Sequence, residues 1–544
     1  MILNVKINEK SIGTKSLYED LSFFINENEK VGFIGRNGTG KTSLFKIIAG
    51  LDSDYKGSID VKKDTKIILT QQEYLDIKKI SSIDYITQSL PDYIKLKNTM
   101  EKYVDIMKND MDMISIYTEA VTLFSEYGYY SIEEKVLNSL LKYKIDPEKA
   151  RMPLIDLSGG EKRFVELVRV MYSKCDIALI DEPTNHMDDI GKNDFISWFK
   201  STNHGICVIT HDRDVLNYVD KIIEIKDRKA FIFSGNYDSY LLQNSISNVT
   251  NIESYEDSLK SLDRLKKQME GIKKRGAHAS TRVMYERVEK EHNKIKKEIE
   301  KPSIWIDEES IKDVNKKVID KYEKYKDKNI SIKINNIKEN KSILLTVKNI
   351  SIGYEFPLFK NISFTLSHGD KIQIKGRNGA GKTSLIKTII SIIENTPHST
   401  KIYDGEILPN DKIKLGIYEQ EIDSYYFNMK LKDAIEDIYR LEKIEIPNVN
   451  KILNDYLFDP AKDSDLLISN LSGGQKARFQ IIKMLLKNPN LLILDEPTNH
   501  LDLPSIEELE NVLKNFHGGI LYVSHDSYFI KKLKGEVIEI SNKD

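Results

Sequence analysis

The sequence predicts an α/β protein made of two copies of one domain, joined by an antiparallel α-helical hairpin. Glycine-rich and acidic motifs occur twice in the same order, and in each copy short Val/Ile-rich runs alternate with longer helix-like segments. Between the copies, apolar residues recur every three or four positions in an otherwise polar segment. A chain of 544 residues also exceeds what one hydrophobic core usually holds.

Composition limits the class of protein. The formal net charge is −2, so any binding of nucleic acid has to depend on local charge. Cys175 and Cys207 lack metal-ligand spacing and lie in apolar, strand-like runs, so we expect reduced core residues. The N-terminus does not read as a signal peptide, and no run approaches the ~18 apolar residues of a membrane span. We therefore expect a cytoplasmic protein with no membrane part.

The repeat defines the domains. GRNGTGKTS at 35–43 recurs as GRNGAGKTS at 376–384, and LSGG, DEPTNH and a later histidine recur at a constant offset of 314. We expect domains at 1–240 and 342–544, with a linker at 241–341. The first copy has about 34 additional residues before its LSGG, and they predict a helical insertion at about 84–150.

Each GxxxxGK[ST] motif follows a predicted strand and precedes a predicted helix, which is the context of a phosphate-binding loop. Backbone N–H groups and the helix N-terminus hold the phosphates of ATP. Lys41 and Lys382 are expected to contact the β- and γ-phosphates, and Thr42 and Thr383 to bind Mg²⁺, with the following serines as alternatives. The candidate ATP-binding residues are Gly35, Asn37, Gly38, Gly40, Lys41, Thr42 and Ser43, then Gly376, Asn378, Gly379, Gly381, Lys382, Thr383 and Ser384.

Further downstream, each copy has an apolar strand ending in Asp–Glu. The aspartate is placed to organise Mg²⁺, and the glutamate to orient or deprotonate the attacking water. A glutamine and a later histidine in each copy are candidates to sense the metal and the γ-phosphate. These residues are Asp181, Glu182, Gln72 and His211 in the first copy, and Asp495, Glu496, Gln420 and His525 in the second.

The order of these motifs resembles an ATP-binding cassette. In that family two cassettes pack head to tail, and the LSGG serine of one closes on the ATP held by the other. The resemblance implies that Lys41 shares a site with Ser472 and that Lys382 shares one with Ser158, within a monomer. The LSGG residues concerned are Ser158, Gly159, Gly160, Ser472, Gly473 and Gly474.

Cassettes also stack an aromatic side chain on adenine, just ahead of the strand before the phosphate loop. Tyr354 fits this position in the second copy. The aligned stretch of the first copy, SIGTKS, has no aromatic residue, and Tyr18 is either a substitute or a core residue.

Tandem cassettes in one chain, DEPTNHxD in both, and SGNYDSYL leading into a charged helical linker resemble the ABC-F family. This resemblance implies a ribosome-bound ATPase whose linker enters the tRNA exit site and contacts P-site tRNA and large-subunit rRNA. We favour protection against large-subunit antibiotics, with the phenicol–oxazolidinone branch as the nearest, because of KPSIWIDEESI and the compact tip. A housekeeping translation factor and, less favoured, the ATPase subunit of an efflux transporter remain alternatives.

The linker carries a local positive charge. A seam of Leu259, Leu262, Leu265, Met269 and Ile272 predicts one leg of a hairpin that turns near residues 273–281 and ends at Pro302, with one long helix as the alternative. Residues 264–287 hold eight Lys/Arg and two acids, which favours contact with an RNA backbone. The candidate RNA-binding residues are Lys273, Lys274, Arg275, His278, Arg282 and Arg287.

Overall fold

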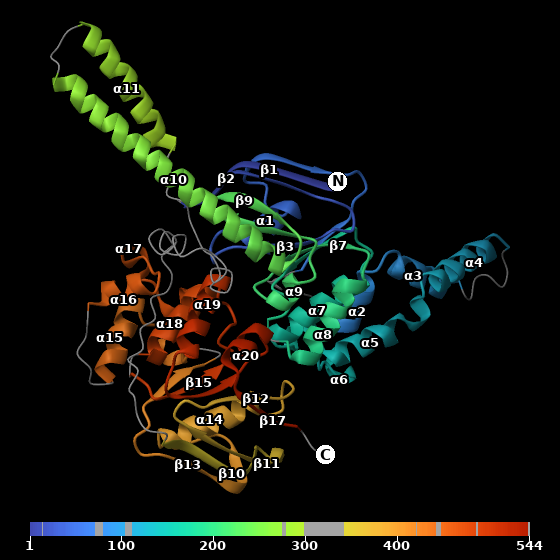
Figure 1. Ribbon diagram of the computed structural model, residues 1–544. Helices are drawn as coiled ribbons and strands as arrows, with labels where there is room; N and C mark the ends of the chain where they lie inside the picture. Colours follow the sequence, from blue (N-terminus) through green and yellow to red (C-terminus); the bar gives the residue numbers. More distant parts are fainter. Residues whose placement is uncertain are drawn as a thin grey trace.

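The computed structural model contains two α/β cassettes and a long helical hairpin that projects from them (Figure 1). It describes residues 1–13, 15–70, 80–103, 111–185, 187–274, 279–298, 342–419, 422–441, 448–485 and 488–541. The predicted fold class, two α/β cassettes, is confirmed. No helix among these residues combines the length and apolar character that crossing a membrane requires.

The first cassette has a sheet of six strands and a separate antiparallel sheet of three. Strands such as β6, Ile177–Asp181, are almost wholly buried, as expected where helices cover both faces of a parallel sheet. The order in the large sheet is β5 (Ile67–Leu69), β6, β7 (Gly205–Ile209), β3 (Lys30–Ile34), β8 (Lys221–Lys226) and β9 (Lys229–Ser234), with only β9 antiparallel. The small sheet has β2 (Lys15–Ile25), β1 (Leu3–Ile12) and β4 (Lys56–Val61).

Helices of the first cassette form two groups. One group packs on the sheet: α1 (Lys41–Ile48), α7 (Gly159–Tyr172), α8 (Asp189–Ser201) and α9 (Arg213–Leu216). The other comes mostly from the predicted insertion: α2 (Ser82–Gln88), α3 (Tyr93–Tyr103), α4 (Met111–Glu126), α5 (Ile132–Lys142) and α6 (Pro147–Arg151), with 3₁₀ turns at Tyr129–Ser131 and Leu154–Asp156. Helices α3 and α4 extend away from the cassette as an arm, held by packing among Tyr93, Phe124 and Tyr129 (Figure 1).

The second cassette repeats this plan. Its parallel sheet has the order β14 (Leu415–Tyr418), β15 (Leu491–Asp495), β16 (Gly519–Val523), β12 (Lys371–Lys375) and β17 (Glu536–Glu539). Its antiparallel sheet has β11 (Pro357–Ser367), β10 (Ile343–Gly353) and β13 (Lys401–Pro409). The helices are α14 (Lys382–Ile393), α15 (Leu431–Leu441), α16 (Val449–Asp455), α17 (Pro460–Asp463), α18 (Gly473–Leu485), α19 (Leu503–Lys514) and α20 (Ser527–Leu533), with 3₁₀ turns at Ser424–Tyr426 and Ile468–Asn470.

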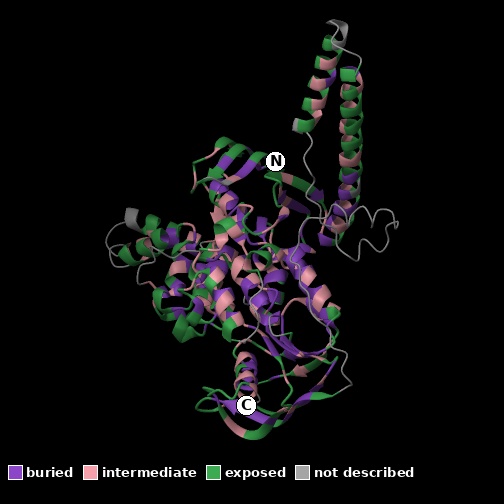
Figure 2. Cartoon of the chain, turned by 90° about the vertical axis from the view of Figure 1, so that its left-hand side faces the viewer, coloured by how far each residue is buried: buried purple, intermediate pink, exposed green. Residues whose placement is uncertain are grey.

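Two helices, α10 (Tyr237–Lys274) and α11 (Ala279–Glu298), lie side by side as the legs of the hairpin, which excludes one long helix (Figure 1). Of the predicted seam, Ile272 is buried against α11, whereas Leu259 is 38% exposed. The base of α10 is buried in the first cassette (Figure 2). The boundary expected at residue 240 therefore falls inside this helix, and Pro302 lies outside the described residues.

Both cysteines are free and buried. Cys207 lies in β7, as expected for a residue of an apolar strand. Cys175 does not lie in a strand, because the chain between α7 and β6 enters the core at that point. The expectation of a strand at Cys175 was therefore wrong, although the side chain is a core residue.

Buried charges cross between the cassettes. Arg213, which is 5% exposed, donates from its guanidinium to the fully buried Glu510 and, at 3.0 Å, to Asp526. The Lys532 ammonium lies 2.9 Å from Glu510. Lys192 pairs with Asp212 at 2.9 Å within the first cassette and donates to the His525 carbonyl oxygen of the second at 3.3 Å. Buried charge is therefore a main part of the contact between the two ATP-binding halves, beside apolar packing such as that of Leu503 in the core of the first cassette.

Removing Arg213 tests how much this contact stabilises the protein. Arg213→Ala leaves Glu510 and Asp526 buried without the guanidinium that pairs with them, so we expect the free energy of unfolding to fall by about 3 kcal/mol. This value is near the lower end for a broken buried ion pair, because Lys532 still pairs with Glu510. Urea unfolding measures the loss. Lys142→Ala, which breaks a half-exposed pair with Asp194, is the control and should cost about 0–1 kcal/mol. Equal losses for the two variants would contradict this account of the interface.

Candidate functional site

The motif residues of each copy meet at the carboxyl ends of three neighbouring strands. In the first cassette β6, β7 and β3 are adjacent, and they are followed by Asp181–Glu182, His211 and the phosphate loop. In the second cassette β15, β16 and β12 bring together Asp495–Glu496, His525 and the second loop. Residues more than 170 positions apart thus form one site, as expected for ligand sites of parallel α/β sheets.

The first phosphate loop has the backbone of an anion cradle. Gly38 and Gly40 have φ values of 79° and 97°, and a Cβ on Gly35 would lie 2.5 Å from the Ile225 carbonyl oxygen. The Lys41 ammonium folds back over the loop and donates to the carbonyl oxygen of Gly35 at 2.6 Å. Thr42 donates its hydroxyl to Asp181 at 2.7 Å. The paired threonine and aspartate are the oxygen donors that Mg²⁺ prefers, so this geometry fits a nucleotide with its metal.

The second loop has the same geometry. Lys382 donates to the Gly376 carbonyl oxygen at 2.7 Å, and Thr383 donates to Asp495 at 2.9 Å. Ser43 and Ser384 line the same cavity, but the Ser384 hydroxyl lies 3.3 Å from that of Tyr354. The position of the threonine hydroxyls favours Thr42 and Thr383 over the serines as metal ligands, and these roles stay predictions.

Both candidate catalytic glutamates have an unusual backbone. Glu182 and Glu496 have φ values of 46° and 49°, in the left-handed region that non-glycine residues rarely adopt. A hydrogen bond from each glutamate N–H holds this conformation, to Ile209 at 2.8 Å and to Val523 at 3.0 Å. Burial, together with repulsion from Asp181, raises the pKa of Glu182 to about 8, and burial also raises the pKa of Glu496. A raised pKa makes the carboxylate form a stronger base, which suits a group that accepts a proton from water.

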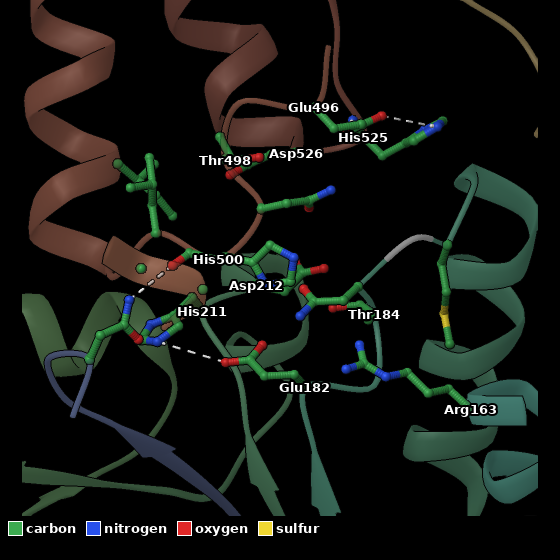
Figure 3. A pocket seen from close by; sticks show the side chains of 18 of the residues that line it. Arg163, Glu182, Thr184, His211, Asp212, Glu496, Thr498, His500, His525 and Asp526 are labelled. Atoms are coloured by element: carbon green, nitrogen blue, oxygen red, sulfur yellow. Dashed lines mark hydrogen bonds and ion pairs between the residues drawn. The ribbon is translucent and has the colours of Figure 1, made fainter. Parts of the chain in front are cut away.

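Each histidine faces the glutamate of its own cassette (Figure 3). The distance from Nε2 to the carboxylate is 3.7 Å for His211 and Glu182, and 3.5 Å for His525 and Glu496. Burial, reinforced by Lys41, lowers the pKa of His211 to about 3, so this ring is neutral near pH 7. The structure therefore places each histidine beside the candidate catalytic glutamate of its own cassette, and the expected contact with the γ-phosphate stays a prediction.

One cavity of about 1240 Å³ contains both sites, and residues of both cassettes line it (Figure 3). At the first site Lys41 faces Ser472, Gly473 and Gly474 across this cavity. The Asn37 side chain donates to the His500 carbonyl oxygen at 2.9 Å, and a Cβ on Gly474 would lie 2.3 Å from its amide nitrogen. The expected pairing of the first phosphate loop with the second LSGG is present.

The pairing expected at the second site is not present. The backbone N–H of Asn378 donates to Asp188 of the first cassette at 3.1 Å, but Ser158, Gly159 and Gly160 are not among the residues that line the cavity. A Cβ on Gly159 or Gly160 would meet no atom within 4 Å. Lys144 lies near this loop, and repulsion from Arg377 and Lys382 adds to burial in lowering its pKa. Lys144, Arg377 and Lys382 thus gather positive charge beside the second phosphate loop.

The adenine positions of the two sites differ. Tyr354 is 53% exposed and lines the cavity with Leu358, which fits its predicted stacking role. In the first cassette Ile12 and Leu17 line the cavity instead. Tyr18 is fully buried and donates its hydroxyl to the Gly40 carbonyl oxygen, so it supports the phosphate loop as a core residue and does not stack on a base.

Several sequence-predicted residues lie outside the described part of the chain, namely Gln72, Gln420, Arg275 and His278. The other four candidate RNA-binding residues lie near the far end of the hairpin and are exposed: Lys273, Lys274, Arg282 and Arg287. The Lys273 ammonium lies 5.2 Å from the centre of the Tyr285 ring, and Arg282 pairs with Glu286 at 3.2 Å. Their contact with RNA stays a prediction.

Sequence reasoning missed the residues that directly follow DEPTNH. Asp188 and Asp502 each reach the phosphate loop of the other cassette, where they accept from the backbone N–H groups of Asn378 and Asn37. Both belong to the repeated motif, NHMD in the first copy and NHLD in the second. Their equal place in the repeat was a signal that could have identified them as interface residues.

Comparison with known proteins gives one family. The family model described as "ABC transporter" matches residues 18–185 and 359–499. The chain is 30% identical to the putative ATP-binding protein YdiF of Bacillus subtilis (strain 168), over 100% of this chain and 80% of that protein. It is 27% identical to ABC transporter F family member 5 of Arabidopsis thaliana, over 98% of this chain and 74% of that protein. It is 26% identical to the ribosome protection protein VmlR of Bacillus subtilis (strain 168), over 97% and 84%.

Solved structures resemble the whole chain in fold. A chain in the crystal structure of a complex of an archaeal ribosomal stalk protein with an archaeal ribosome recycling factor superposes with a TM-score of 0.60 at 16% identity. The match covers 98% of this chain and 87% of that one. The structure of an RNase-L inhibitor superposes with a TM-score of 0.59 at 16% identity, over 98% of this chain and 87% of that one. Both have the arrangement of two cassettes.

The metal ligands can be tested by separating threonine from serine. Thr42→Val with Thr383→Val removes two hydroxyls without changing side-chain shape, so we expect the Mg²⁺ concentration for half-maximal ATP hydrolysis to rise at least about tenfold. The control, Ser43→Ala with Ser384→Ala, should shift it less than about twofold. A larger shift for the serine pair, measured by titrating Mg²⁺ in the ATPase assay, would assign the ligands to the serines.

Proposed function

The chain belongs to the ABC-F family of ATP-binding cassette ATPases and is an ATP hydrolase, and on that premise we propose that it works on the ribosome. ATP and Mg²⁺ are its cofactors in this proposal. Thr42, Asp181 and Gln72 would hold the metal at the first site, and Thr383, Asp495 and Gln420 at the second. When bound there, Mg²⁺ would supply positive charge to neutralise the phosphates.

Hydrolysis follows from the residues at each site. The backbone N–H groups of the loop and Lys41 or Lys382 bind the phosphates. Glu182 or Glu496 then accepts a proton from the attacking water, and His211 or His525 contacts the γ-phosphate. Ser472 closes the first site from the other cassette. Ser158 approaches the second site when the negative charge of bound phosphates offsets the positive charge beside the second phosphate loop.

The observation that carries the ribosome proposal is the hairpin. Its base is buried in the first cassette, with Tyr237 edge-on to Tyr528 of the second, and its far end carries exposed Lys273, Lys274 and Arg282. An exposed cationic tip suits a polyanion, and RNA is the polyanion of a ribosome. The related VmlR is named a ribosome protection protein, which supports the same assignment.

In the finer form of the proposal the protein enters the tRNA exit site and contacts the peptidyl-tRNA and large-subunit rRNA with its tip. It thereby protects the ribosome from large-subunit antibiotics. The alternative is a housekeeping factor that relieves stalled ribosomes. Growth of a sensitive bacterium that expresses the chain, tested on a panel of such antibiotics, separates the two. Lack of protection against every drug favours the housekeeping role.

An ATP-trapped form tests ribosome binding. Because the double variant Glu182→Gln with Glu496→Gln lacks both general bases, ATP hydrolysis should fall on the order of 10²–10⁴-fold. The cassettes then stay closed, and the protein should co-sediment with ribosomes in a sucrose gradient when ATP is present. If the trapped protein stays at the top of the gradient with ATP, the ribosome assignment fails.

The tip charges test the RNA contact. Lys273→Ala with Lys274→Ala should remove about two from the slope of log affinity for ribosomes against log salt, because each phosphate-contacting lysine contributes about one. It should also abolish protection in cells, while ATPase activity without ribosomes stays near that of the parent. Lys260→Ala is the matched control, since this exposed lysine of α10 pairs with Asp257 nearer the base. Equal effects of both variants would exclude a specific role for the tip.

A further inference from the structure

The two histidines at the candidate sites have different partners across the cassette interface. Nδ1 of His525 lies 2.8 Å from the Asp189 carboxylate, which belongs to the first cassette. Asp189 is the first residue of α8 and also lies 3.6 Å from the Lys375 ammonium, close to the second phosphate loop. The second site therefore contains a line of three groups, Glu496, His525 and Asp189, drawn from both halves of the chain.

At the first site the charge of Asp502 from the second cassette acts on His211, but among the described residues no carboxylate is hydrogen-bonded to this ring. The constant offset of 314 places Leu503 where Asp189 stands, and Leu503 is buried and apolar. Neither ring nitrogen of His211 has a hydrogen-bond partner in the part of the chain that the structure describes. The motif repeat extends through NHMD and NHLD, and the two copies diverge from this position onward.

A carboxylate only accepts hydrogen bonds, so the contact with Asp189 requires the proton on Nδ1 of His525. That bond fixes both the ring plane and the direction of Nε2, which points to Glu496 at 3.5 Å. A carboxylate that orients a histidine in this way commonly changes the rate of the reaction that the histidine supports, through its geometry and its tautomer. The ring of His211 lacks this restraint.

We propose that Asp189 is a positioning residue for ATP hydrolysis at the second site, supplied by the first cassette, and that the first site works without an equivalent. Asp189 contacts neither the cradle of the phosphates nor Glu496 directly, so it acts through His525. The hydrolytic geometry of the second site then forms only when α8 of the first cassette is in place, which ties turnover there to cassette pairing.

A purely structural role accounts poorly for the contact. The Asp189 side chain is 42% exposed, and a pair with that exposure contributes about 0–1 kcal/mol to stability. The interface has its own buried ion pairs, from Arg213 to Glu510 and Asp526, which do not involve Asp189. Loss of Asp189 should therefore leave the cassettes folded and paired.

The experiment measures kcat and KM for ATP in the full chain. With Asp189→Asn in a Glu182→Gln chain, where the second site supplies most of the turnover, kcat should fall about tenfold while KM changes less than about twofold, because the oriented histidine is lost and the phosphate cradle is kept. Asp189→Glu keeps a carboxylate and should recover several-fold of that loss. The matched control is Asp194→Asn on the same helix, whose carboxylate pairs with Lys142. It should leave both constants near those of the parent.

Repeating Asp189→Asn in a Glu496→Gln chain assigns the effect to a site. There the first site supplies most of the remaining turnover, so the fold-loss in kcat should be at least about fivefold smaller than in the Glu182→Gln chain. A rise in KM without loss of kcat would overturn the proposal. So would failure of Asp189→Glu to exceed Asp189→Asn, or a fall in the thermal midpoint equal to that of Arg213→Ala.

Discussion

Buried charges form a central part of the contact between the two cassettes, and the other features of the molecule depend on it. Arg213, Glu510 and Asp526 meet where the segments after the two histidines cross. Buried ion pairs contribute little net stability compared with apolar packing, but they tolerate little misalignment because an unpaired charge is costly. The cassettes are thus held in a defined alignment, and that alignment puts Asn37 against Gly474 and Asp189 against His525.

Much of the site could be predicted from the sequence because parallel sheets bring the carboxyl ends of their strands together. Given the motif order, the meeting of Lys41, Glu182 and His211 follows from topology alone. The pairing of Lys41 with Ser472 came from family resemblance, since one chain read in order gives no reason for it. The left-handed backbone of Glu182 and Glu496 could not be predicted, because the bonds that hold it come from a neighbouring strand.

Tertiary packing decided where the local pattern left alternatives or misled. Tyr18 was open between base stacking and the core, and it lies under the phosphate loop because the hairpin of β1 and β2 turns it inward. Ser158 has the same motif as Ser472, but it does not line the cavity that holds the second phosphate loop. Identical motifs therefore do not guarantee identical sites. At the adenine positions, Tyr354 lines the second site where Leu17 lines the first. At the position that contacts the histidine, the second site has Asp189, whereas the repeat places Leu503 at the first.

The depth at which α10 leaves the first cassette has a mechanical consequence. Burial of α10 in the cassette ends near Ile252. From there to Lys274 the helix spans about 33 Å at 1.5 Å per residue. Such a rod, braced by α11, acts as a lever arm: a rotation of about 10° at its fulcrum moves its far end by roughly 6 Å. Closure of the cassettes by a small angle is thereby converted into a displacement as large as a nucleotide base.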